Sequence, residues 1–314
     1  MFLKNMLLAG EQVIILYVIA AVGFVADKVG FFPEKTAKKC TDLLFYIVTP
    51  AVIIKSFLDN TGSIKGFFIA LGCGFLLHGL CVVMAPLLFR RCPNKERAAI
   101  FRYASCYGNC GYMGLPLAEA LFGNEGVIYC SAIVASFQIF SFTHGIYIMT
   151  KDSETKQKFD IKKLIFNPGI ISVAIGLPLF LLDVEVPRII MEPIGYVGSL
   201  NSPLAMLIFG TYIANTSFKS IFKEWRIYAV AAIKLLVTPA ILLVLFKLLG
   251  IGGVLLGSVM VPASAPSASN TALFAAKYDR DTGLASQTVA IVSFISIITM
   301  PVMIALSQLQ IQLW

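Results

Sequence analysis

Charged residues are scarce in this 314-residue chain. Asp, Glu, Lys and Arg together make up 13% of it, whereas hydrophobic residues make up 58% and the mean hydropathy is +0.84. Soluble domains carry about 25% charged residues, so this shortage excludes an ordinary soluble protein and predicts a membrane protein. The formal net charge of +8 does not indicate nucleic-acid binding, because the basic residues lie between apolar runs, where membrane orientation explains them.

The usual catalytic and metal-binding patterns are lacking as well. The chain has two histidines, no HExxH or Gly-x-Ser-x-Gly motif, no ATP-binding loop and no paired carboxylates within its apolar runs. These absences argue against an intramembrane enzyme and against an ATP-driven pump. The seven cysteines include no CxxC pair and no Cys/His cluster, so we expect buried thiols without disulfides, cofactors or a firm metal site.

Long apolar runs, by contrast, are abundant. A spanning helix needs roughly 20 apolar residues, so the runs predict an all-α polytopic membrane protein with ten transmembrane helices in the lipid bilayer. The first run is expected to be a span and not a cleaved signal peptide. The predicted spans cover residues 8–26, 38–57, 65–89, 97–122, 126–149, 165–182, 190–216, 226–249, 252–276 and 283–310.

The basic residues give these spans an orientation. Most of the 25 Lys and Arg residues lie in connections that share one face of the membrane. The positive-inside rule places that face in the cytoplasm, which predicts a multi-pass protein of the plasma (cytoplasmic) membrane with both termini outside. The basic connections are residues 28–39, 90–102, 151–163, 219–226 and 277–280.

The sequence indicates an internal duplication. Its longest polar stretch predicts a basic cytoplasmic linker at residues 151–164, between a first repeat at 1–150 and a second at 165–314. Thr49-Pro50 in the second span matches Ser202-Pro203 in the seventh, 153 residues on. Because each half holds an odd number of spans, five, the second repeat must be inverted, which is a transporter architecture.

The fourth and ninth spans contain residues that break helices. Residues 107–116 read YGNCGYMGLP and residues 261–271 read VPASAPSASNT. Gly costs about 1 kcal/mol and Pro about 3 kcal/mol inside a helix, so we expect both spans to be broken, at Gly108–Pro116 and at Pro262–Thr271. Paired interruptions at corresponding positions of two repeats indicate a transporter binding site where the broken helices cross.

Half-helix N-termini present free N–H groups and a positive dipole end, which favour an anion such as a carboxylate. Asn109 can fix the orientation of such a group. The alternative is that the small and polar residues only let two helices pack closely. The expected substrate-binding residues are Asn109, Gly111, Tyr112, Pro116, Ser264, Ser267, Ser269, Asn270 and Thr271.

Three ionisable residues are candidates for coupling transport to H⁺ or Na⁺. Lys234 lies near the middle of the eighth span, where a charge is costly unless it is paired or wetted. His78 and Glu119 are the other two, and all three have structural alternatives, namely a backbone pair, a packed imidazole and a carboxylate that reaches the membrane surface. A sodium ion would bind near Ser267 and Asn270.

Several of these motifs resemble those of the auxin efflux carrier family. Residues 109–117 (NCGYMGLPL) with 121–123 (LFG) resemble its first crossover, residues 274–278 (FAAKY) the end of its second, and residues 234–239 (KLLVTP) a basic residue and proline of its eighth span. The likeness covers essentially the whole chain. The short linker is typical of compact prokaryotic members, whereas Thr271 stands where plant members tend to have a proline.

The resemblance implies a scaffold of helices 1, 2, 6 and 7, a transport domain of helices 3–5 and 8–10, and an organic anion held in part by Asn109. We therefore expect a secondary active, alternating-access transporter of malate, malonate, lactate or an auxin-like acid, and a homodimer through the scaffold helices. Alternatives are a sodium-coupled bile-acid-type symporter, a cation/proton antiporter and a non-transporting receptor. An antiporter would be expected to carry paired intramembrane aspartates, which the sequence lacks.

Overall fold

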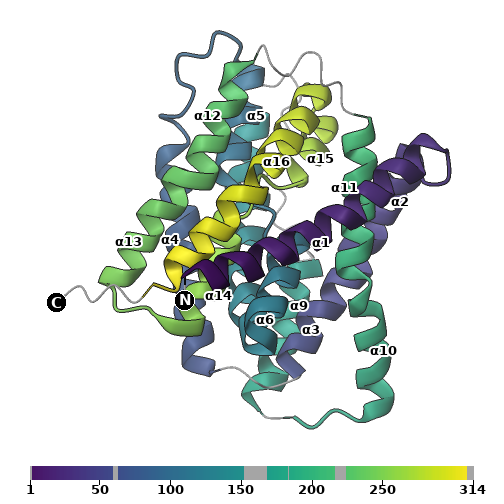
Figure 1. Cartoon of the computed structure of the whole chain (residues 1–314), viewed down its shortest axis with the longest axis vertical. Coiled ribbons are helices and arrows are strands. Elements are labelled where there is room, and N and C mark those ends of the chain that lie inside the picture. Colours follow the sequence, from purple (N-terminus) through teal and green to yellow (C-terminus); the bar gives the residue numbers. More distant parts are fainter. Residues whose placement is uncertain (1, 59–62, 152–167, 183, 216–223, 310–314) are drawn as a thin grey trace.

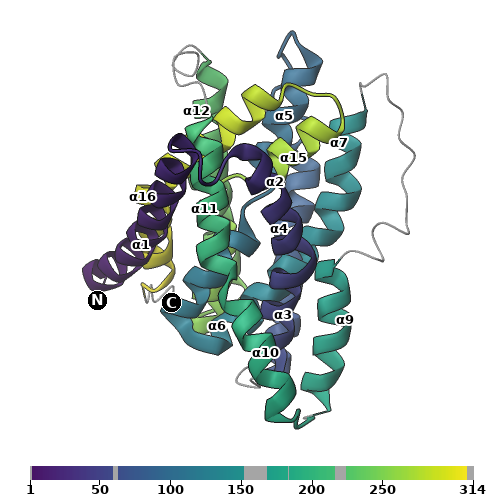
Figure 2. The same cartoon turned by 90° about the vertical axis from the view of Figure 1, so that its right-hand side faces the viewer.

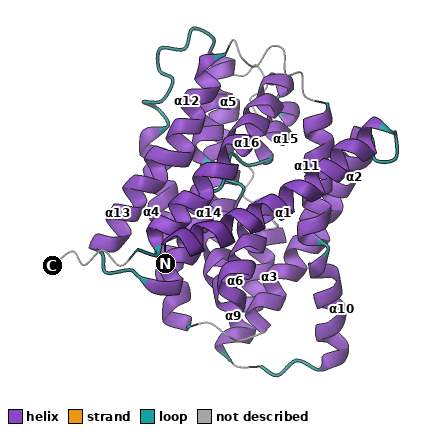
Figure 3. Ribbon diagram, viewed as in Figure 1, coloured by secondary structure: helices purple, strands orange, loops and turns teal. Residues whose placement is uncertain are grey.

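The fold is helical, as the sequence predicts. A computed structural model describes residues 2–58, 63–151, 168–182, 184–215 and 224–309, which contain helices and no strand (Figure 3). Five helices in this part of the chain are long and apolar enough to cross a membrane, and two shorter helices are also apolar. The five are Ile64–Met84, Cys110–Thr150, Arg188–Ala214, Trp225–Leu248 and Thr282–Ser307, and the shorter two are Pro168–Leu181 and Gly253–Ser264.

The first half of the chain holds the predicted spans one to five. A single helix, α1, forms the first span, and the second is continuous from α2 to α3. The elements are α1 (Phe2–Lys28), α2 (Glu34–Leu43), η1 (Leu44–Val48), α3 (Thr49–Leu58), α4 (Ile64–Met84), α5 (Lys95–Cys106), η2 (Cys110–Gly114), α6 (Leu115–Phe140), η3 (Ser141–Gly145) and α7 (Ile146–Thr150). The predicted linker at 151–164 lies outside the described residues, apart from Lys151.

The second half of the chain holds the predicted spans six to ten. Its elements are α9 (Pro168–Leu181), α10 (Arg188–Ser199), α11 (Asn201–Ala214), α12 (Trp225–Ala232), η5 (Ile233–Val237), α13 (Thr238–Leu248), α14 (Gly253–Ser264), α15 (Asn270–Lys277) and α16 (Thr282–Ser307). In both halves the fourth predicted span consists of two shorter helices separated by a non-helical segment.

Gly123 separates the fourth predicted span from the fifth. Helix α6 runs through this position without a loop, but Gly123 has φ 63° and ψ −158°, a conformation that only glycine adopts readily. The chain therefore turns sharply there. This turn lies within the predicted boundary between residues 122 and 126, and it brings the second arm of α6 back along α4 and α14.

Two helix crossings bring backbones very close together. Helix α1 packs on α11, where a Cβ atom placed on Gly23 would lie 2.2 Å from the Leu207 carbonyl oxygen, and one on Gly210 would lie 1.9 Å from the Ala20 carbonyl oxygen. Helix α9 packs on α3, where a Cβ atom on Gly176 would lie 2.5 Å from the Phe57 ring. These glycines permit a crossing closer than larger side chains allow.

The other helices pack around α6 and α16. Helix α6 contacts α4 and α14, and α16 contacts α12, α14 and α15. Helix α1 also packs along α16, and the Tyr17 hydroxyl donates a hydrogen bond to the Ser293 carbonyl oxygen. Figure 2 shows α10 continuing below α11, α9 at the right-hand side, and α5, α7 and α15 toward the upper end of the molecule.

Basic residues collect at one end of the molecule, at the top of Figure 1, where α5 and α12 begin and α15 connects to α16. There the guanidinium of Arg97 lies 3.0 Å from the Glu224 carboxylate, which also pairs with Arg226 at 3.0 Å. Arg280 lies 3.5 Å from Glu96. Three predicted cytoplasmic connections, as far as the structure describes them, therefore share one end of the fold (90–102, 224–226 and 277–280), whereas the fourth, 28–39, lies at the side of the molecule in Figure 1.

Candidate functional site

Two interrupted helices meet near the centre of the fold. Helix α5 ends at Cys106, and the chain is non-helical from Tyr107 to Asn109 before η2 begins. Helix α14 ends at Ser264, and residues 265–269 separate it from α15. The breaks lie within or next to the predicted segments, but Pro116 and Pro262 are both helical, at the start of α6 and near the end of α14.

The two interruptions are joined by their backbones. Gly108 and Ser267 form an antiparallel β-bridge. The Asn109 amide donates to the Pro266 carbonyl oxygen at 2.7 Å, and the Ala268 amide donates to the Tyr107 carbonyl oxygen at 2.9 Å. Unwound backbone buried in a membrane protein must find such partners, and here each interruption provides them for the other.

The half-helices that enter this crossing have capped C-terminal ends. The Ser267 hydroxyl donates to the Ala104 carbonyl oxygen of α5 at 2.7 Å, and the Lys234 ammonium donates to the Ala263 carbonyl oxygen of α14 at 2.9 Å. Lys234 is 1% exposed. A positive charge is favourable at the negative end of a helix dipole, so Lys234 stabilises the end of α14.

Lys234 also lies against the first interruption. A Cβ atom placed on Gly108 would lie 3.0 Å from both Cε and Nζ of Lys234 and 3.3 Å from the Ala265 carbonyl oxygen. A larger residue at position 108 would force these groups apart. A glycine is therefore needed at position 108, because the Lys234 ammonium and the Ala265 backbone approach the first interruption closely there.

The N-terminal end of η2 remains unpaired. Among the described residues, the amides of Gly111 and Tyr112 donate no backbone hydrogen bond, and the Asn109 side chain makes none although it is 5% exposed. A Cβ atom built on Gly111 would meet no atom within 4 Å, so there is open space beside this turn. Free amides at a helix start form a site for an anion.

A pocket opens at this turn, with an empty volume of ≈ 400 Å³. This volume counts all the space between the lining atoms and includes open solvent. None of its lining residues is Asp, Glu, Lys, Arg or His. The lining is formed by Phe45, Thr49, Gly108, Asn109, Cys110, Gly111, Tyr112, Val134, Phe137, Gln138, Ala268, Ser269 and Asn270.

Five of the predicted binding residues are brought together in this pocket, and four are not. Asn109, Gly111, Tyr112, Ser269 and Asn270 line it. The remaining four have other positions. Pro116 is in the first turn of α6, the Ser264 hydroxyl donates to the Met260 carbonyl oxygen of its own helix, the Ser267 hydroxyl caps α5, and Thr271 is fully buried outside the lining.

The three coupling candidates lie outside the pocket lining. The His78 imidazole is 1% exposed, lies 2.8 Å from the Gly74 carbonyl oxygen and 3.1 Å from the Ser136 hydroxyl, and stacks on Phe140. Glu119 is exposed on the first arm of α6. Lys234 lies against Gly108 of the β-bridge and does not line the pocket, so it can act on a ligand there only by electrostatic attraction.

The sequence analysis missed Gln138 and Thr49. Gln138, on the second arm of α6, is 5% exposed, and its side-chain oxygen has no hydrogen-bond partner among the described residues. The Thr49 hydroxyl donates to the Asn201 side-chain oxygen at 3.3 Å, which links α3 to α11. Gln138 could have been noticed as an amide in the middle of an apolar span, since polar groups at such a depth are costly.

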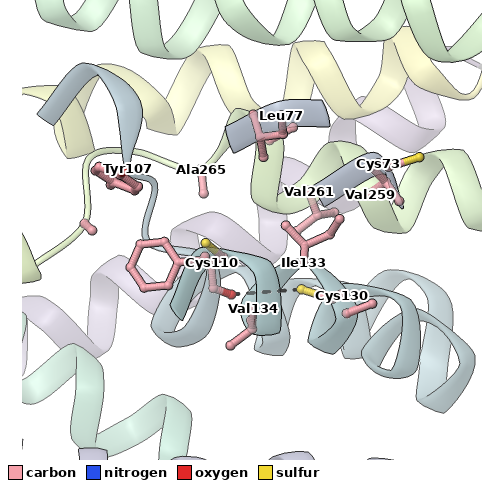
Figure 4. Close-up of a cluster of buried hydrophobic side chains, with 14 of the residues drawn as sticks. Cys73, Leu77, Tyr107, Cys110, Cys130, Ile133, Val134, Val259, Val261 and Ala265 are labelled. Atoms are coloured by element: carbon pink, nitrogen blue, oxygen red, sulfur yellow. Dashed lines mark hydrogen bonds between the residues drawn. The ribbon is translucent and has the colours of Figure 1, made fainter. Parts of the chain in front are cut away.

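Apolar side chains of α6 and α14 pack against the crossing. Figure 4 shows Tyr107 and Ala265 of the two interruptions above Cys110 of η2 and Ile133, Val134 and Cys130 of α6, with Val259 and Val261 of α14 nearby. The Cys130 thiol contacts the Cys110 carbonyl oxygen at 3.9 Å. Two residues of this cluster, Cys110 and Val134, also line the pocket.

Comparison with known proteins matches almost the whole length of this chain to membrane transport proteins. The profile of a family described as "Membrane transport protein" matches residues 8–304. An uncharacterized transporter of Methanocaldococcus jannaschii is 25% identical over 92% of this chain and 95% of its own. A putative malonate transporter of Rhizobium meliloti is 24% identical over 88% and 89%, and an uncharacterized transporter of Methanothermobacter thermautotrophicus is 21% identical over 93% and 96%.

Proposed function

Because this chain belongs to the membrane transport protein family, the auxin efflux carrier family whose motifs it resembles, we propose that it is a secondary active transporter of small organic anions. Asn109 carries this proposal. Its side-chain amide, which has no hydrogen-bond partner among the described residues, belongs to the pocket lining, beside the free backbone amides of Gly111 and Tyr112 at the start of a half-helix. Such a turn favours a carboxylate, because both the N–H groups and the dipole are complementary to negative charge.

Malonate is the first substrate to test, because one relative is described as a putative malonate transporter. Malate and lactate have the same carboxylate chemistry and are of similar size. Coupling to H⁺ or Na⁺ belongs to the same proposal, with Lys234, His78 and Glu119 as candidates for the proton and the oxygens near Asn270 for sodium.

We propose alternating access by movement between two groups of helices. The scaffold group is α1, α2, α3, α9, α10 and α11, and the transport group is α4–α7 and α12–α16. One feature of the packing supports an inverted repeat. Gly176 and Phe57 meet where α9 crosses α3, and Gly23 and Gly210 lie in the crossing of α1 with α11. Gly176 follows Gly23, and Gly210 follows Phe57, by 153 residues. The pocket lies where the groups meet, with Phe45 and Thr49 on the scaffold side.

The same proposal orients the protein in the cytoplasmic membrane. The basic end of the fold faces the cytoplasm and both termini face outward, in accordance with the positive-inside rule. Exposed apolar residues on the scaffold group, such as Val18, Val22 and Tyr196, are available for lipid or for a second copy.

A counterflow assay in proteoliposomes tests the function. The wild type is expected to exchange labelled malonate, malate or lactate, and gradients of sodium or pH that change accumulation would identify the coupling ion. Asn109→Ala is expected to lower exchange at least tenfold, because it removes the side chain that orients the anion. Expression and melting temperature should be close to those of the wild type.

Asn215→Ala provides the matched control, since Asn215 lies at the end of α11 and pairs with Asp27. Normal exchange by Asn109→Ala would remove this residue from the binding site. Saturable binding of these acids without any exchange would favour a receptor.

A further inference from the structure

The charge of the candidate pocket limits the charge of its ligand. The lining contains amide, hydroxyl, aromatic and backbone groups but no Lys, Arg or His. The nearest buried cation is Lys234, whose ammonium already donates to the Ala263 carbonyl oxygen and is separated from the pocket by Gly108. A second negative charge on a ligand would therefore have no counter-charge, and an unpaired buried charge is strongly unfavourable.

The free groups of the pocket are of two kinds. At the start of η2, the Gly111 and Tyr112 amides are donors, which suit a carboxylate. On the second arm of α6, the Gln138 side-chain oxygen is an acceptor without a donor, although its residue is 5% exposed. A buried acceptor left unpaired is costly, so a ligand that donates a hydrogen bond there would relieve the cost.

We propose, resting on the proposed transport function, that the substrate binds as a monoanion with one carboxylate and one hydrogen-bond donor. The carboxylate lies at the amides of η2 and Asn109, and the donor pairs with Gln138. Hydroxy acids and singly protonated dicarboxylic acids have this pattern. A fully ionised dicarboxylate does not, because its second carboxylate brings a charge without a partner and offers no donor to the glutamine.

Three compounds with the malonate skeleton allow the effect of the ligand's charge to be measured separately from the effect of its hydrogen-bond donor. At alkaline pH malonate is a dianion without a donor, monomethyl malonate is a monoanion without a donor, and malonamate is a monoanion whose amide donates. In competition against labelled lactate exchange, we expect malonamate to bind about tenfold more tightly than monomethyl malonate, and both to bind more tightly than malonate. Lactate should likewise outcompete propionate, which lacks the hydroxyl.

Gln138→Met tests the role of the glutamine, because it keeps the length of the side chain and removes the acceptor. It should abolish the preference of malonamate over monomethyl malonate and of lactate over propionate, while both monoanions remain better than malonate. Gln308→Met, which makes the same change at the end of α16 beside Ser307, should keep every preference.

The outcomes distinguish this inference from the transport function itself. If malonate at alkaline pH competes as well as malonamate, the monoanion rule is wrong although transport stands. If malonamate and monomethyl malonate compete equally well in the wild type, Gln138 does not accept a hydrogen bond from the ligand. If a folded, monodisperse protein neither binds nor exchanges any of these acids, the transport proposal fails and this inference fails with it.

Discussion

Lys234 combines two roles that can be separated at the scale of the residue. Its ammonium caps the C-terminal end of α14 through the Ala263 carbonyl oxygen, and its charge lies beneath the bridge that supports the pocket. A neutral donor could perform the first role. Only a cation can perform the second, because the potential of a buried charge extends through several ångströms of protein.

Lys234→Gln is expected to lower anion exchange by about tenfold or more, since a charge-assisted interaction contributes about 1.5–3 kcal/mol. The glutamine can still donate to Ala263, so the melting temperature should change little. Lys234→Met, which loses both the charge and the donor, should lower exchange and melting temperature together. Exchange at the wild-type rate in Lys234→Gln would show that the ammonium serves only as a cap.

Individual site residues could be predicted where their chemistry coincides with a break in the chain. Asn109 and Gly111 stand in a run of glycines that no membrane helix would carry without reason, and both line the pocket. Ser264 and Thr271 have the same composition around them, but which serine or threonine faces a cavity depends on helix rotation, which the sequence leaves open. Gln138 lies in an unbroken helix, so a search confined to interruptions and ionisable groups passes over it.

Prolines explain the position of three wide turns at the scale of the element. The π-helical turns η1, η2 and η5 end at Val48, Gly114 and Val237, two residues before Pro50, Pro116 and Pro239 respectively. A proline has no N–H to donate and its ring collides with the carbonyl four residues earlier. An extra residue in the preceding turn avoids the collision, so helices can contain these prolines without ending.

The crossing of α1 with α11 depends on glycine. Gly210→Ala should destabilise the protein by about 1–3 kcal/mol, because the new methyl group would meet the backbone of Ala20 and Phe24, which cannot move aside. Thermal unfolding in detergent measures this effect. Gly10→Ala in α1 meets no atom within 4 Å and should be neutral or stabilising, since alanine favours a helix. Equal melting temperatures for the two variants would contradict the close packing of α1 on α11 at Gly210.

At the scale of the whole molecule, the distribution of basic residues and the helix order are mutually consistent. The apolar runs predict where chain segments turn, and three of the described connections rich in Lys and Arg, at 90–102, 224–226 and 277–280, lie at one end of the structure. Composition and periodicity could predict this arrangement, because hydrophobic length and charge act over tens of residues. The close crossings could not be predicted, since they depend on which glycines of distant helices meet.

Thiol labelling in intact cells tests the orientation. Phe31, in the turn after α1, is 86% exposed, and Ile189, at the start of α10, is 82% exposed. In a variant without the seven native cysteines, Ile189→Cys should react with a membrane-impermeant maleimide from outside, and Phe31→Cys should react only after permeabilisation. The opposite pattern would place the basic end outside the cell and contradict the proposed orientation.

The bridge between Gly108 and Ser267 also affects how the protein can be assembled. Helices α14 and α15 hold 12 and 8 residues, which reach only about 18 Å and 12 Å as helices, whereas the hydrocarbon layer is about 30 Å thick. Neither half-helix alone crosses this layer, and only the two together reach across it, so the extended residues between them lie within the layer. The Ala268 amide and the Pro266 carbonyl oxygen of this segment, however, find their hydrogen-bond partners in Tyr107 and Asn109 of the other crossover. Neither half of the chain can therefore rest stably in the bilayer until the other has been inserted beside it.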